Sequence, residues 1–136
     1  MEGCVFCRIV NGELPAAKVF EDESTLAFMD LQSVNPGHTL VVVKPHRANL
    51  YELDDELAGA ALRTAARVAR AVKKAYGCEG VTLFQANEKA GAQTVFHFHI
   101  HVLPRWEGDG MALAWPAKNP SREALDEMAA KLRAAL

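Results

Sequence analysis

The sequence predicts a single α+β domain over residues 1–136, built on an antiparallel sheet of about five strands. The length of 136 residues is close to the commonest domain size of roughly 100–150 residues, and 50% of the residues are hydrophobic, which is enough for a sizeable core. Strand-like segments precede and follow one long helical segment, and short turns join most neighbouring strands. Strands joined in this way pair antiparallel, which indicates an α+β fold.

Hydrophobic periodicity and turn residues define the expected elements. The clearest is a long central helix in which apolar residues recur every three or four positions; Asp54 or Asp55 can cap its start and Gly77 its end. The other elements are a short N-terminal helix at 5–10, strands at 18–21, 25–30, 39–43, 81–85 and 96–103, and a C-terminal helix from 121 to the end.

Charge and cysteine content narrow the class of protein. A net charge of −2 with interspersed acids and bases argues against a nucleic-acid partner. No stretch reaches the roughly 20 apolar residues of a membrane span, and the N-terminus does not resemble a signal peptide. We therefore expect a cytoplasmic protein without a membrane partner. Three cysteines, an odd number, argue against a disulfide framework.

Three histidines alternate with apolar residues in His97-Phe98-His99-Ile100-His101. Side chains of a strand alternate between its faces, so the histidines are expected on one face, roughly 7 Å apart. Charging one imidazole disfavours charging its neighbours, so such a row is costly unless the rings have different roles. The pattern favours a nucleophile, a phosphate donor, a metal ligand or a proton relay. A plain zinc site and an exposed polar face are the alternatives.

Cys4 and Cys7 have the C-x-x-C spacing of half a zinc site. Two other interpretations remain open. One is a redox pair, although no thioredoxin-like βαβ pattern surrounds it, and the other is two buried small residues. Cys78 has no evident partner, and we expect it to pack in the core.

The segment from His97 to Leu103 resembles the His-φ-His-φ-His-φ-φ motif of the histidine-triad (HIT) superfamily, where φ is an apolar residue. The resemblance covers nearly the whole chain. Residues 4–9 resemble the N-terminus of bacterial members, and residues 27–31 resemble the nucleoside-binding strand. Residues 37–46 resemble a second histidine-bearing strand, and residues 87–96 resemble the loop before the motif. The combination identifies the chain as a member, with the HIT-like fold.

The resemblance implies a nucleotide hydrolase or transferase. His99, the middle histidine, would attack the α-phosphorus of a purine nucleotide conjugate and form a nucleotidyl-histidine intermediate that water hydrolyses. His101 resembles a phosphate contact, and His38 resembles the histidine that supports proton transfer near the leaving group. Substrates would be AMP conjugates such as adenosine phosphoramidates, acyl-adenylates or dinucleoside polyphosphates. The alternative function is a zinc-containing nucleotide-binding or adaptor protein with little turnover.

The resemblance also implies a binding pocket with apolar walls for the purine and a carboxylate for the ribose hydroxyls. The expected substrate-binding residues are Phe6, Ile9, Phe28, Asp30, Leu31, Asn87, Gln93, Thr94 and His101.

Zinc is the implied cofactor. Cys4, Cys7, His46 and His97 would form a closed Cys2His2 set that resembles the site of some bacterial members and would be structural. Without zinc, His97 would join the proton relay.

A homodimer is also implied. Trp115 resembles the C-terminal tryptophan of the Hint branch, which reaches the partner subunit's site. The loop at 104–110 instead resembles the Fhit-like and bacterial branches, so the branch stays open.

Overall fold

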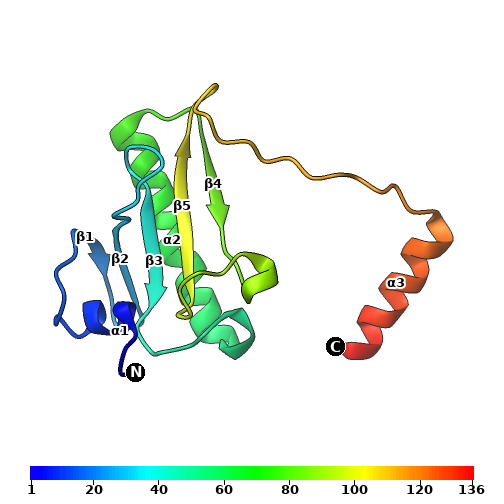
Figure 1. The fold of residues 1–136 in the computed structure, drawn as a ribbon, viewed down its shortest axis with the longest axis horizontal. Coiled ribbons are helices and arrows are strands. Elements are labelled where there is room, and N and C mark those ends of the chain that lie inside the picture. Colours follow the sequence, from blue (N-terminus) through cyan, green and yellow to red (C-terminus); the bar gives the residue numbers. More distant parts are fainter.

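The computed structural model describes residues 1–136 and contains a five-stranded antiparallel sheet with three α-helices (Figure 1). The strands lie in the order β1-β2-β3-β5-β4. They are β1 (Lys18–Glu21), β2 (Thr25–Met29), β3 (Thr39–Val43), β4 (Gly80–Phe84) and β5 (His99–Arg105). The α-helices are α1 (Val5–Val10), α2 (Asp55–Tyr76) and α3 (Arg122–Ala135). The predicted α+β class and antiparallel sheet are therefore confirmed.

Helix α2 begins and ends where its sequence indicates. The Asp54 side chain accepts a hydrogen bond from the Leu57 N–H, and Gly77 ends the helix in the left-handed conformation, with φ 61°. An acidic cap suits the positive end of the helix dipole, and glycine adopts positive φ without a Cβ penalty.

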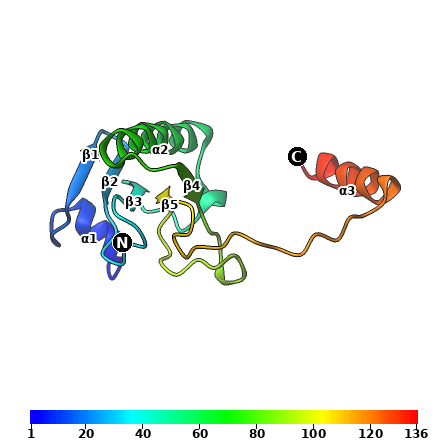
Figure 2. The same cartoon turned by 90° about the horizontal axis from the view of Figure 1, so that it is seen from above.

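The two helices α1 and α2 lie on opposite faces of the sheet (Figure 2). Alternate side chains of the strands divide between these faces. The α2 face holds the larger core and includes Ala27, Val41, Val43, Ile100 and Val102. The α1 face holds a smaller cluster of Phe6, Ile9, Leu26, Phe28, Leu40 and Val42.

The strand predicted at 96–103 is shifted toward the C-terminus. Strand β5 begins at His99 and runs through Pro104 to Arg105. Before it, the Phe98 N–H donates to the carbonyl of Arg47 at 2.7 Å, outside the ladder with β3. His97 therefore precedes the strand, and the expectation of three histidines in one strand is wrong for it. The apolar alternation continues through this bend, because Phe98 still joins the α2 core.

The C-terminal part extends away from the body. Residues 112–121 form no helix or strand, and α3 stands apart at the end of this extended arm (Figures 1 and 2). Trp115 on the arm is 80% exposed, and Leu125, Met128 and Leu132 leave apolar surface exposed on α3. None of the helices combines the length and hydropathy needed to cross a membrane.

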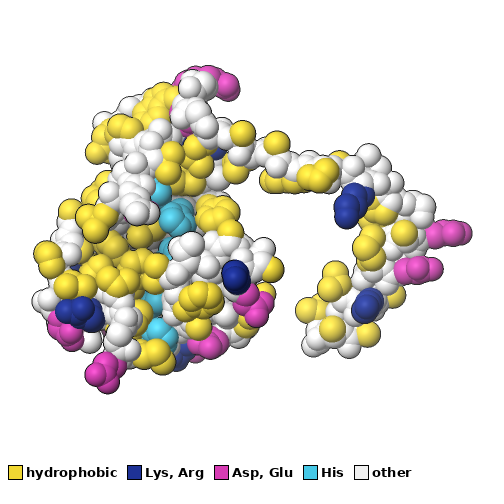
Figure 3. Space-filling model, in the orientation of Figure 1, with side chains coloured by type: hydrophobic (Ala, Val, Ile, Leu, Met, Phe, Trp, Pro, Cys, Tyr) yellow, Lys and Arg dark blue, Asp and Glu magenta, His cyan; other side chains and the backbone are white.

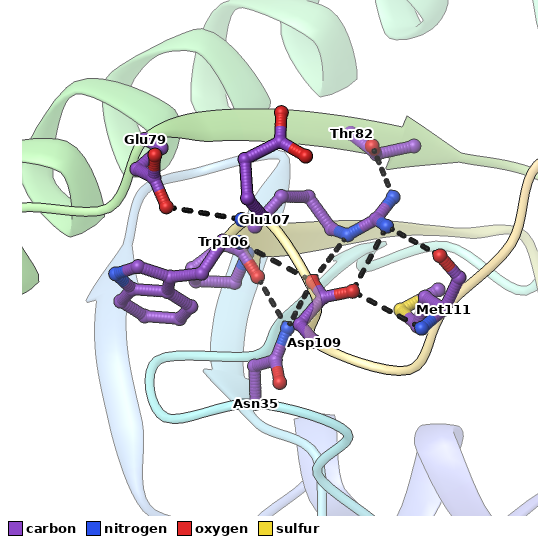
Figure 4. Close-up of polar contacts among 9 residues, drawn as sticks. Asn35, Glu79, Thr82, Trp106, Glu107, Asp109 and Met111 are labelled. Atoms are coloured by element: carbon purple, nitrogen blue, oxygen red, sulfur yellow. Dashed lines mark hydrogen bonds and ion pairs between the residues drawn. The ribbon is translucent and has the colours of Figure 1, made fainter.

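A clamp between Arg105 and Asp109 fixes the point where the arm leaves the body (Figure 4). The Arg105 Nε donates to Asp109 Oδ2 at 2.7 Å, and its Nη2 donates to Oδ1 at 3.1 Å. The Asn35 side chain donates to the same carboxylate at 3.0 Å and to the Pro104 carbonyl at 2.8 Å. The guanidinium holds the pKa of Asp109 well below its usual range. The clamp thereby joins the β2–β3 loop to the end of β5.

Gly37 provides a test of how tightly this loop packs. A Cβ at Gly37, where φ is +91°, would lie 2.9 Å from the Tyr76 ring, whereas Gly12, where φ is +77°, has nothing within 4 Å. We expect Gly12→Ala to lower the free energy of unfolding by about 1–2 kcal/mol, the cost of a left-handed alanine. Gly37→Ala should cost about 1–3 kcal/mol more because the ring must move. Urea denaturation measures both, and equal losses would contradict the close packing.

Candidate active site

His99 and His101 point to the face of the sheet that α1 covers. Val42 of β3 lies opposite His99, and Leu40 lies opposite His101. Because Val42 and Leu40 belong to the α1-side cluster, their partners in the ladder face the same way. The two ring centroids are 5.2 Å apart. Histidine side chains are visible along a hollow between hydrophobic side chains on this face (Figure 3).

The main chain assigns the proton of His99. Its Nδ1 lies 2.7 Å from the carbonyl oxygen of His97. A carbonyl can only accept, so Nδ1 carries the hydrogen and Nε2 carries the lone pair. Burial lowers the pKa of His99, although the hydrogen bond to the carbonyl and the charge of Asp30 oppose this effect. His99 is therefore a neutral imidazole with an unprotonated Nε2, the form that can act as a nucleophile.

His38, His101 and Asp30 form a second group beside His99. His38 Nε2 lies 2.9 Å from His101 Nδ1 and 3.3 Å from Asp30 Oδ2. Burial lowers the pKa of His101 to about 4, and the neighbouring His99 and His38 add to that shift. Burial also lowers the pKa of His38, against the attraction of Asp30. Near neutral pH the site thus holds three neutral imidazole rings beside one carboxylate.

A cavity of about 350 Å³ adjoins the histidines, within the usual size range of small-molecule sites. The Phe6 ring is 5.1 Å from the His99 ring and 5.6 Å from the Phe28 ring. Most of the lining residues are apolar. The polar ones include Asp30, Thr94, His99 and His101. This arrangement suits a ligand with a flat apolar part and a polar end.

Most of the predicted binding residues meet in this cavity. Those that line it are Phe6, Ile9, Phe28, Asp30, Leu31, Thr94 and His101. The side chain of Leu31 is nevertheless fully exposed. The lining also includes residues that the sequence did not single out, among them Pro15, Ala16 and Ala17 from the stretch before β1. Nothing in that short unpatterned stretch distinguishes a pocket wall from an ordinary loop.

Asn87 and Gln93 lie outside the cavity. Asn87 pairs with the Gln85 side chain and accepts from the Leu50 N–H at 2.8 Å. The buried Gln93 accepts from the main-chain N–H of Glu88 and donates to the carbonyls of Ala48 and Val95. In this structure both side chains shape the loop that leads to Thr94. Their predicted contact with substrate stays a prediction.

Cys4, Cys7, His46 and His97 form a second cluster, and all four ligand atoms lie within 4.8 Å of one another. Three sulfur–nitrogen distances are 3.3, 3.4 and 3.5 Å. Ligands on a tetrahedral zinc ion are separated by roughly 3.6 Å for a sulfur–nitrogen pair. His97 Nε2 lies 2.7 Å from the carbonyl of Val43 and must donate to it, which leaves its Nδ1 lone pair facing the sulfurs. The donor set and its protonation fit zinc.

The cavity and the Cys/His cluster share helix α1. Cys4 caps the helix, and its Sγ accepts from the Cys7 N–H. Phe6, between the cysteines, contacts the rings of His97 and His99 edge to face at 5.9 and 5.1 Å. The fold and the two clusters therefore define a candidate small-molecule site with an unprotonated imidazole nitrogen beside a candidate metal centre.

Comparison with known proteins places this arrangement in a family. The profile of the HIT domain matches residues 11–108. "Protein hit" from Bacillus subtilis is 43% identical over 115 residues, 84% of this chain and 79% of that protein. Adenosine 5′-monophosphoramidase from Saccharomyces cerevisiae is 34% identical over 134 residues, 98% of this chain and 82% of that protein.

Solved structures agree. A HIT family protein from Bacillus anthracis aligns with a TM-score of 0.95 and 35% identity, over 99% of this chain and 98% of that one. A Zn-bound histidine triad family protein from Mycobacterium smegmatis aligns with a TM-score of 0.77 and 35% identity, over 98% of each chain. The chain belongs to the HIT family.

Proposed function

We propose that this protein is a nucleotide hydrolase that cleaves AMP conjugates at the α-phosphorus through His99. The observation that carries the proposal is the unprotonated Nε2 of His99 beside a mostly apolar cavity. The yeast relative is named as an adenosine 5′-monophosphoramidase, which supports an adenosine phosphoramidate as substrate. Acyl-adenylates and dinucleoside polyphosphates present the same α-phosphorus and are further candidates.

The reaction takes place in two displacements. His99 Nε2 forms a bond to the α-phosphorus, and the bond from phosphorus to the leaving group breaks. Water then attacks the nucleotidyl-histidine, the phosphorus–nitrogen bond breaks, and AMP and free His99 result. The proton that the attacking water loses replaces the one that the leaving group took up on departure. The His101 ring, 5.2 Å from the His99 ring, can contact the phosphoryl oxygens or the leaving group, and positioning with charge stabilisation supplies most of the catalysis.

The nucleoside lies against α1 in this proposal. Phe6, Ile9 and Phe28 provide the apolar walls for the purine. Asp30, 16% exposed at its side chain, is the only carboxylate in the cavity lining and accepts from the ribose hydroxyls.

Removal of the nucleophile separates turnover from binding. We expect His99→Ala to lower kcat on adenosine phosphoramidate by about 10⁴-fold or more, because the covalent step requires the imidazole. AMP affinity, measured by calorimetry, should stay within about threefold, because the apolar walls are intact. Near wild-type turnover in His99→Ala would contradict the nucleophile assignment. Nucleotide binding by the wild type without turnover of any AMP conjugate would favour the alternative, a binding or adaptor protein.

The proposal includes a structural zinc ion held by Cys4, Cys7, His46 and His97. Its support is the fit of the donor atoms and the zinc-bound Mycobacterium smegmatis neighbour. When bound, zinc would supply folding energy and offer no open position for water, because four protein ligands fill a tetrahedral site.

Cysteine variants test the zinc site with a matched control. We expect one zinc per chain in untagged protein and almost none in Cys4→Ser or Cys7→Ser. Loss of the ion should lower the free energy of unfolding by about 4 kcal/mol if free zinc is a thousandfold above its dissociation constant. Cys78→Ser changes another buried cysteine, outside the cluster, and should keep its zinc. Elemental analysis and denaturation measure both effects. Zinc-free wild type from zinc-supplemented growth would contradict the site.

The proposal also includes a homodimer in which each chain, residues 1–136, is a single domain. An amphipathic helix of 14 residues is marginal alone in water, so α3 needs an apolar surface that its own body does not provide. The exposed apolar side chains of Trp115, Leu125, Met128 and Leu132 are suited to a second copy of the chain. The Bacillus anthracis structure aligns over 99% of the chain, which includes this arm.

Truncation tests the role of the arm. We expect the full chain to sediment at about twice its mass of 14.8 kDa. A chain that ends at Pro120 lacks α3 and should sediment as a monomer, because the apolar face of α3 is gone. A full-length monomer would contradict the dimer, and a dimer of the truncated chain would contradict the role of α3.

A further inference from the structure

The β2–β3 loop holds His38 through its backbone. The main-chain N–H of Val34 donates to His38 Nδ1 at 3.1 Å. An amide can only donate, so Nδ1 carries the lone pair, and a neutral ring must then carry its proton on Nε2. His38 is 3% exposed, which keeps water from competing for either nitrogen.

The proton on His38 Nε2 determines the state of its neighbour. His101 Nδ1 lies 2.9 Å from His38 Nε2 and must accept this hydrogen bond. The proton of neutral His101 is therefore on its own Nε2, which can donate a hydrogen bond to a phosphoryl oxygen or to the leaving group.

We infer that His38 is a positioning residue: a neutral donor, locked by the Val34 amide, that fixes His101 in the tautomer with its proton on Nε2. The inference rests on the proposed function and makes specific the role of His38, for which the resemblance implied only support of proton transfer near the leaving group. The locked ring holds its proton and orients His101, while His101 faces the substrate. Asp30 Oδ2, 3.3 Å from His38 Nε2, can accept the same hydrogen.

A metal ion is the competing explanation for this group. The ligand atoms of Asp30, His38 and His101 are separated by 2.9, 3.3 and 3.7 Å, close to the spacing around a metal. A metal would need the lone pair of His38 Nε2. The Val34 hydrogen bond requires that lone pair to be on Nδ1 instead, so hydrogen bonding explains the group and a metal does not.

The loop is fastened so that the Val34 amide keeps its direction. The His38 N–H donates to the Asn35 carbonyl at 3.1 Å. The Asn35 side chain in turn donates to Pro104 and Asp109, which joins the loop to the Arg105–Asp109 clamp (Figure 4). A tautomer lock built on a loop requires such support, because a shift of the amide would release His38 Nδ1.

Long-range ¹H–¹⁵N NMR of the ¹⁵N-labelled protein at neutral pH reports the tautomer of each ring without any turnover. We expect His38 and His101 to have their proton on Nε2, and His99 to have the opposite tautomer as an internal reference. Spectra of His38→Gln and His101→Gln assign the signals. A proton on His38 Nδ1, or a doubly protonated His38, would overturn the inference. A failure of the proposed hydrolase activity would leave these spectra unchanged, so the two outcomes are distinguishable.

Kinetics test whether a hydrogen bond from a neutral donor at position 38 is sufficient for turnover. Gln at position 38 can place a neutral N–H donor near the position of Nε2, whereas Leu cannot. We expect His38→Leu to lose about 10²-fold or more in kcat, as removal of proton-transfer positioning does elsewhere. His38→Gln should recover to within about tenfold of wild type and keep the shape of the wild-type pH profile of kcat. Equal losses in both variants, or a changed profile in His38→Gln, would overturn the inference.

Discussion

Hydrogen bonds from the main chain to imidazole rings determine the chemistry of this site. Carbonyls of Val43 and His97 bind one nitrogen each of His97 and His99, and the amide of Val34 binds one nitrogen of His38. Because a carbonyl only accepts and an amide only donates, the backbone decides which nitrogen of each ring holds the proton. Three identical side chains thereby differ: His97 has its lone pair on Nδ1, His99 has its lone pair on Nε2, and His38 has its proton on Nε2.

The late start of β5 gives His97 its separate role. If the pairing of β5 with β3 began before His99, the Phe98 N–H would not be free to donate to the Arg47 carbonyl. The bend brings His97 beside His46, with ring centroids 5.1 Å apart, and its Nδ1 beside both cysteines. His99 and His101 remain in the ladder, where pairing with β3 and β4 fixes their direction. Because the strand begins within the histidine motif, His97 joins the Cys/His cluster, whereas His99 and His101 line the cavity.

Local patterns were sufficient to predict much of this structure. The caps of α2, the apolar alternation of the strands and the HIT motif each depend on residues close in sequence, and each was found from them. The start of β5 could not be predicted, because it depends on a hydrogen bond from Phe98 to the carbonyl of Arg47, about fifty residues earlier in the chain. The contacts of Asn87 with the Leu50 N–H and of Gln93 with the Ala48 carbonyl are also tertiary, and no local pattern favours them over contact with a phosphate. Asp30 and His38 lie close together for a local reason. Met29 pairs with Thr39, so Asp30 and His38, the next residues toward the β2–β3 loop, lie opposite each other.

Helix α1 couples the Cys/His cluster to the cavity beside His99. It has six residues, far fewer than the roughly 12–15 that an isolated helix needs in water, so its order must come from its contacts. Cys4 and Cys7 fasten one side of it to His97 and His46, and Phe6 and Ile9 fasten the other side to the sheet. Phe6 contacts the rings of both His97 and His99, so any displacement of the cysteines moves this wall of the cavity relative to His99. A structural ion at Cys4 and Cys7 would thus hold the cavity wall in place without being part of the cavity itself.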